Sequence, residues 1–162
     1  MQHTPPYGDA LRSPFQRETN MQKLRLIYGL GCWLLGIVTG ALHTLFELAP
    51  KSARGEELSQ LLATFTLELP GSQVSAYSLF FGISLLMGVM LIGFGVVNLL
   101  VLRSTPKNQL PSLSFQTVNV LFSLLAFLLA WNYLFILPLA LTGLSFLCFL
   151  SVLIAGRMRR AG

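Results

Sequence analysis

Three long stretches without a charged residue constrain this chain more than any other feature of its sequence. They lie between Arg25 and Glu47, between Glu68 and Arg103, and between Lys107 and Arg157. A helix needs roughly 20 mostly apolar residues to cross the ~30 Å hydrocarbon core of a bilayer. Each stretch reaches that length, and none shows the alternating pattern of a membrane β-strand. The sequence therefore predicts membrane-spanning helices, whose backbone groups pair within the helix.

The third stretch is too long for a single crossing. Residues 108–156 would extend about 73 Å as one helix, at ~1.5 Å per residue. The segment Trp131-Asn132-Tyr133 places aromatic residues suited to a membrane–water interface, and Pro138 suits the first turn of a new helix. We therefore predict an all-α, polytopic bundle with four transmembrane helices, over residues 26–46, 77–102, 113–131 and 137–156.

The few charges of the chain are sorted by side. Only 10% of the residues are charged, against ~25% in soluble domains, which excludes an ordinary soluble enzyme and argues against a nucleic-acid binder despite the net charge of +5. With four spans, nine of the eleven Lys and Arg residues fall on one side, and Lys51 and Arg54 fall on the other. Basic excess marks the cytoplasmic side. We expect a multi-pass protein of the bacterial cytoplasmic (inner) membrane with both termini cytoplasmic and the loop 47–76 outside.

The two ends of the chain differ in composition from the middle. Residues 1–20 have the composition of a disordered cytoplasmic tail, or of a mis-called extension if translation begins at Met21. Residues 21–156 form the four-span domain, and residues 157–162 a basic cytoplasmic tail. We interpret this basic tail as a topology anchor, with contact to anionic lipid headgroups as the alternative.

The outer loop contains a helical pattern. Apolar residues recur at helical spacing from Leu58 to Phe65, two glutamates stand in the first turn, and Pro70-Gly71 follows. This predicts one short amphipathic helix, about 55–68, on the outer surface. It would cover the end of the bundle or, alternatively, act as a lid or a docking face.

One polar stripe near the outer end of the first span is the leading candidate site. Gly36, Gly40, His43 and Glu47 are spaced by four, three and four residues, so they share a helix face. Small residues at GxxxG spacing let another helix approach closely. We expect the same packing role for three residues of the second span and hypothesise a ligand site at the outer interface. The packing residues are Gly36, Gly40, Ser84, Gly88 and Gly95, and the ligand-binding residues are His43, Glu47, Tyr77 and Trp131. The alternative is a histidine that merely bonds a neighbouring helix.

Other chemistry lacks the residues it would need. Cys32 and Cys148 stand alone, and His3 and His43 are the only histidines, which leaves no CxxC pair, no zinc motif and no bis-histidine haem site. No nucleotide-binding or nucleophile-elbow motif occurs. We therefore predict no metal, no cofactor and no catalytic residue. Polar residues of the third span, including Gln116 and Asn119, are expected to form interhelical hydrogen bonds.

Three segments of the spans form recognisable motifs. They are Gly36-Ile37-Val38-Thr39-Gly40-Ala41-Leu42-His43-Thr44, Tyr77-Ser78-Leu79-Phe80-Phe81-Gly82 and Trp131-Asn132-Tyr133-Leu134-Phe135-Ile136-Leu137-Pro138. Together they resemble a family of small bacterial integral membrane proteins with four helices and an unassigned role. The resemblance covers residues 21–156 and supports the four-helix architecture, but it implies no reaction.

We expect a non-enzymatic accessory or assembly component of the membrane. Its partners would be the lipid bilayer and another membrane protein or a second copy of the chain. The alternative is a binder of a lipid, a quinone or another hydrophobic small molecule, in an outward-facing pocket near His43 and Glu47. A weaker alternative is a small membrane enzyme that uses these two residues.

Overall fold

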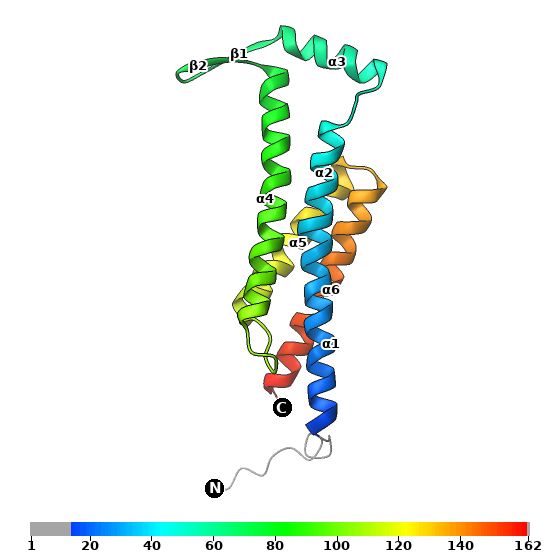
Figure 1. Ribbon diagram of the computed structural model, residues 1–162, viewed down its shortest axis with the longest axis vertical. Coiled ribbons are helices and arrows are strands. Elements are labelled where there is room, and N and C mark those ends of the chain that lie inside the picture. The colour runs from blue at the N-terminus through cyan, green and yellow to red at the C-terminus, as the bar shows by residue number, and fades with distance from the viewer. Residues whose placement is uncertain (1–13, 162) are drawn as a thin grey trace.

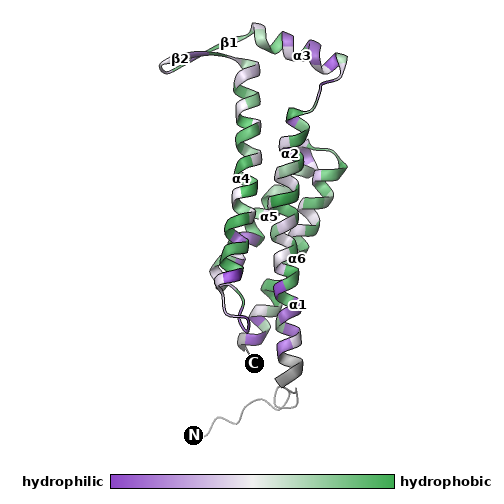
Figure 2. Cartoon of the chain, in the orientation of Figure 1, coloured by the Kyte–Doolittle hydropathy of each residue, from purple (hydrophilic) through white to green (hydrophobic). Residues whose placement is uncertain are grey.

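The computed structural model describes residues 14–161, and within them it is a bundle of long helices (Figure 1). Four helical segments are long and apolar enough to cross a membrane, which confirms the predicted all-helical fold. They are Glu18–Leu48, Ala76–Ser104, Leu113–Tyr133 and Ile136–Arg159. Hydrophobic residues dominate these helices, and hydrophilic residues gather toward the two ends of the bundle (Figure 2).

The first span is one continuous rod built from three segments: α1 (Pro14–Cys32), the π-helical η1 (Trp33–Val38) and α2 (Thr39–Leu48). The Thr39 hydroxyl donates a hydrogen bond of 2.6 Å to the Leu34 carbonyl, five residues earlier, as the wider π turn allows. A π segment has no simple sequence signal, and the sequence predicted an ordinary helix here.

The N-terminal boundary also differs from the expectation of a disordered tail over residues 1–20. The helix begins at Pro14, so residues 14–20 belong to α1, while residues 1–13 lie outside the described part. Proline is favoured at a first helical position, and Gln16, Arg17 and Glu18 after it are good helix formers.

The other spans begin at serine caps or at a short turn. Ser75 caps α4 (Ala76–Ser104) by accepting a hydrogen bond from the Ser78 amide at 3.1 Å, and Ser112 caps α5 (Leu113–Tyr133) in the same way. Helix α6 (Ile136–Ala161) follows after residues 134–135, with Pro138 in its first turn. The break between the last two spans is therefore shorter than the gap between the predicted spans 113–131 and 137–156, because Asn132 and Tyr133 are still helical.

The segment between the first two spans contains a correction. Helix α3 (Ala53–Thr64) is capped by Ser52, so it begins two residues before the predicted start at 55, and it ends four residues before the predicted boundary at 68. Strands β1 (Thr66–Leu69) and β2 (Ser72–Ser75) then form an antiparallel hairpin. Alternating Thr, Phe and Leu residues suit a strand, and Gly71, at φ +83°, supplies the positive dihedral of a turn. Pro70-Gly71 is thus a hairpin turn rather than a helix stop.

The arrangement of the elements separates two ends of the molecule. Helix α3 and the hairpin lie across one end, and the beginning of α1 and the end of α6 lie at the other, which we call the terminal end (Figure 1). The apolar core sits between α1, α5 and α6, toward the terminal end, where Tyr28 packs edge-on against Phe149 at 5.3 Å between ring centroids. Toward the opposite end, α2 packs against α4.

A buried polar cluster joins three spans near this core. The Asn119 amide donates to Tyr28 Oη at 2.5 Å and to Asn98 Oδ1 at 2.6 Å, and the Tyr28 hydroxyl donates to the same Asn98 oxygen at 3.0 Å. All three side chains are buried. The cluster therefore ties α1, α4 and α5 together in a region where water cannot compete for the hydrogen bonds.

Candidate functional site

Two pairs of glycines bring the first span into direct contact with α4. Gly36 faces Gly95, and Gly40 faces Gly88. A Cβ atom on Gly40 would lie 2.8 Å from the Gly88 carbonyl oxygen, and one on Gly95 would lie 2.9 Å from Gly36 Cα. Such distances leave no room for a side chain, so the two backbones meet only because these positions are glycine.

This close approach presses the polar stripe of α2 against Ser84 of α4. His43 Nε2 lies 3.0 Å from the Ser84 carbonyl oxygen and also 3.0 Å from Ser84 Oγ. The Ser84 hydroxyl donates to Glu47 Oε2 at 2.9 Å. His43 and Glu47, one helical turn apart on α2, therefore both contact Ser84 of α4.

The hydrogen bonds among these three residues depend on which ring nitrogen of His43 carries the proton. With the proton on Nε2, His43 donates to the Ser84 carbonyl, and the Ser84 hydroxyl donates to Glu47 Oε2. With the proton on Nδ1, Nε2 accepts from the Ser84 hydroxyl. In either tautomer a side chain of α2 bonds Ser84 of α4, so His43, Glu47 and Ser84 form a hydrogen-bonded clamp between the two helices.

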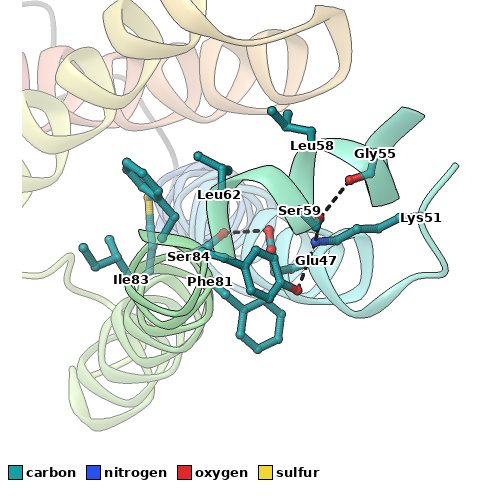
Figure 3. A pocket seen from close by; sticks show the side chains of 12 residues that line it. Glu47, Lys51, Gly55, Leu58, Ser59, Leu62, Phe81, Ile83 and Ser84 are labelled. Atoms are coloured by element: carbon teal, nitrogen blue, oxygen red, sulfur yellow. Dashed lines mark hydrogen bonds between the residues drawn. The ribbon is translucent and has the colours of Figure 1, made fainter. Parts of the chain in front are cut away.

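The clamp borders an open groove of about 510 Å³ between α3 and α4 (Figure 3). Its walls are mainly apolar, and its polar groups include one carboxylate and one ammonium. The lining residues are Glu47, Lys51, Gly55, Leu58, Ser59, Leu62, Tyr77, Phe80, Phe81, Ile83, Ser84 and Met87.

Lys51 holds one end of the groove together. Its Nζ donates to Ser59 Oγ at 2.7 Å and to Tyr77 Oη at 3.0 Å, and it lies 4.2 Å from the centroid of the Tyr77 ring. Lys51 thereby links α3 to the first turn of α4 (Figure 3). Both contacts are solvent-exposed, so the ammonium remains accessible to a ligand in the groove.

The structure brings together most, but not all, of the residues singled out from sequence. Glu47, Tyr77 and Ser84 line the groove, and His43 stands behind Ser84 through their hydrogen bond. Trp131 does not line it: its side chain is 67% exposed at the end of α5, with the ring against Phe127 of the same helix. Trp131 was grouped with Tyr77 because both are aromatic residues suited to the interface. No sequence signal, however, places α5 relative to α3.

Two residues of the groove, Lys51 and Ser59, were missed as candidates. They lie in the segment between the spans, where sequence indicated only a surface helix. One sequence feature could have identified Lys51: it and Arg54 are the only Lys or Arg residues in the loop 47–76. In the described residues, no group of three or more His, Cys, Asp or Glu side chains is placed to hold a metal ion.

Together, the bundle and the groove define a multi-pass helical membrane protein with an amphipathic groove at one end. Comparison with protein-family models, curated proteins and solved structures finds no match to this chain. The resemblance to small four-helix bacterial membrane proteins therefore stays an expectation, and the role of the groove must be argued from its geometry.

Proposed function

We propose that the groove between α3 and α4 binds an amphipathic small molecule of the membrane, such as a lipid or a quinone. The observation that carries this proposal is the combination of an apolar wall with a carboxylate, from Glu47, and an ammonium, from Lys51, in one open groove. Ligand sites typically pair a mostly apolar lining with a few polar groups that orient the ligand.

The position of the groove along α4 supports entry from the bilayer. Phe80, Ile83 and Met87 line it and remain at least half exposed, at 60%, 51% and 50%. On a spanning helix, side chains of this kind face the hydrocarbon. The apolar body of a ligand would lie along them, and its polar end would contact Glu47 and Lys51.

The proposal includes a location and an orientation. We place the protein in a bacterial cytoplasmic membrane with both termini in the cytoplasm, on the basic excess at the terminal end. The groove then opens on the outer side of that membrane, as the alternative interpretation of the sequence expects.

The test is retention of a ligand by the gently extracted protein, measured by native mass spectrometry. We expect a stoichiometric small molecule on the wild type and its loss, by about tenfold or more in occupancy, in Leu62→Trp, because an indole would fill an apolar pocket of this size. Leu61→Trp is the matched control: Leu61 is on the same helix, 55% exposed, and does not line the groove.

Two outcomes would contradict the proposal. One is a wild-type protein that carries no small molecule in any mild extraction. The other is an equal loss in Leu62→Trp and Leu61→Trp, which would indicate that an added indole on α3 harms the protein regardless of the groove.

A second candidate function is that of an accessory subunit, and one observation favours it. The most apolar stretch of α4 is only 17% buried within the chain, against 33% for the first and last spans. Helix α4 thus leaves most of its surface to lipid or to a helix of another protein. A photo-crosslinking residue at Val89, 60% exposed, should capture one defined partner protein in intact membranes; labelling of lipid alone would remove this candidate.

A further inference from the structure

A second pocket lies at the opposite, terminal end of the bundle. It measures about 210 Å³ and is formed by the beginning of the first span, the segment before α5, and facing residues of α5 and α6. It shares no residue with the groove, so nothing argued for it depends on the proposed function. Its lining residues are Met21, Asn108, Gln109, Leu110, Gln116, Gly156 and Arg159.

Gln116 points an unused acceptor into this pocket. Its side chain is 2% exposed, and its Nε2 donates to the Pro111 carbonyl at 2.6 Å, which identifies Oε1 as the other amide atom. Within the described residues, Oε1 is the one buried side-chain polar atom without a hydrogen-bond partner. A buried polar atom without a hydrogen bond destabilises the fold by about 1–3 kcal/mol. A ligand that donates a hydrogen bond to Oε1 would therefore gain binding free energy.

Gly156 keeps the space over this acceptor open. A Cβ atom at position 156 would lie 3.2 Å from Gln116 Oε1 and 3.8 Å from Leu110 Cδ1. The missing side chain thus keeps a methyl group from crowding the buried Oε1 on the side of the pocket that Gly156 lines. Arg25 fixes the segment before α5, which includes the lining residue Gln109. Its guanidinium donates to the carbonyls of Leu102, Pro106 and Gln109 at 2.6–2.9 Å.

Arg159 supplies a cation at the rim. It is exposed, and its Nη1 makes a weak contact with Met21 Sδ at 3.9 Å. A guanidinium binds phosphate and carboxylate oxygens in a bidentate fashion. At the end of a spanning helix this cation stands at the level of the lipid headgroups, where the anionic groups are phosphate esters.

We propose that this pocket binds a phosphate ester that carries free hydroxyl groups. Arg159 holds the phosphate, and a hydroxyl of the ester donates its hydrogen bond to Gln116 Oε1. A glycerol phosphate unit has this chemistry, either as the headgroup of a phosphatidylglycerol-type lipid or as a free metabolite. The basic tail of the chain then contributes a defined lipid or ester site as well as a topology signal.

The experiment is a binding titration of the purified full chain in detergent micelles with three probes. These are short-chain phosphatidylglycerol, phosphatidylcholine with the same chains, and sn-glycerol 3-phosphate. We expect phosphatidylglycerol to bind about tenfold more tightly than phosphatidylcholine, because both lipids carry the phosphate for Arg159 but only phosphatidylglycerol carries a hydroxyl for Gln116 Oε1. Binding of the free ester with the same variant pattern would support the site and identify a soluble ligand; binding of the lipid alone would support it and identify a headgroup.

Two matched pairs of variants separate the pocket from a general effect of charge. Arg159→Gln and Gly156→Ala should each weaken phosphatidylglycerol binding about fivefold to tenfold. Arg157→Gln removes the same charge two residues earlier, outside the pocket, and Gly93→Ala adds a methyl on a helix where no atom lies within 4 Å of it. Both controls should stay within about twofold of the wild type.

Equal weakening by Arg159→Gln and Arg157→Gln would overturn the proposal in favour of a diffuse basic surface. Unchanged binding in Gly156→Ala, or equal binding of the two lipids by the wild type, would overturn it as well. Because Arg159 is exposed, its substitution leaves the fold intact, and the comparison stays decisive even where Gly156→Ala lowers stability.

Discussion

At the scale of single residues, the polar side chains within the spans are used mainly to join helices. Asn119 was expected to form such contacts from its type alone, since polar groups in a membrane seek partners. Its partner Tyr28 was not, because a tyrosine in a span has no signal that tells packing from an interfacial position. Which polar residues meet depends on the rotation of each helix, and the sequence pattern leaves that rotation open.

The Tyr28 hydroxyl can be tested by its removal. Tyr28→Phe keeps the ring that packs against Phe149 but leaves the amide of Asn119 and Oδ1 of Asn98 each short of one partner. We expect a loss of about 0.6–1.7 kcal/mol in the free energy of unfolding, the range for hydrogen bonds between membrane helices. Reversible unfolding in mixed micelles measures it. Tyr133→Phe, at an 81% exposed position, is the control and should be neutral; equal losses in both would refute a special role for Tyr28.

The Ser84 clamp makes a second residue-scale prediction. Ser84→Ala removes the hydroxyl that donates to Glu47 and leaves the carbonyl that His43 contacts. We expect a loss of about 0.6–1.7 kcal/mol in unfolding free energy, with no effect on the terminal-end pocket. Ser151→Ala, at an exposed position whose hydroxyl bonds only the Cys148 carbonyl, should change stability far less. A larger effect at Ser151 would show that the clamp contributes nothing of its own.

At the scale of elements, the sequence predicted the spans well and their connections poorly. The uncharged runs are long and set by the thickness of the bilayer, so helix number follows from them. Each strand of the hairpin is only four residues long, and its apolar residues also fit a helical spacing. The π segment η1 shifts the register beside Gly36, and a one-residue widening has no counterpart in the pattern of apolar residues.

The glycine contacts of the first span lead to a prediction at this scale. A Cβ atom on Gly36 would collide with the backbone of Gly95, whereas one on Gly93 would meet nothing within 4 Å. Gly36→Ala should therefore force α4 away and cost about 1–3 kcal/mol, as overpacking does. Gly93→Ala should be neutral or stabilise by up to about 1 kcal/mol, since alanine favours a helix over glycine. Thermal unfolding in detergent compares them, and shifts of the same sign and size would refute the close contact.

At the scale of the whole molecule, the charge distribution and the fold agree on two distinct ends. The beginning of α1, the segment between α4 and α5 and the end of α6 stand at one end, and α3 and the hairpin stand at the other (Figures 1 and 2). The segments at the first end carry the described basic residues Lys23, Arg25, Arg103, Lys107, Arg157 and Arg159. Four spans return the chain to the side where it began, so a single orientation satisfies every loop.

This orientation predicts opposite outcomes for reporters placed at the two ends. A reporter that folds only in the cytoplasm, fused after Gly162, should be active, and so should one inserted at Asn108 between the second and third spans. A reporter that needs the outer compartment should be active when inserted in the exposed turn at Gly71, where a Cβ atom would meet no neighbouring atom within 4 Å. The exchanged reporters at each site should be silent, because the proposed orientation places the terminal end in the cytoplasm. Activity of the same reporter at Gly71 and after Gly162 would require an even number of spans between two sites that the fold separates by three, and it would overturn the threading together with the outward-facing groove.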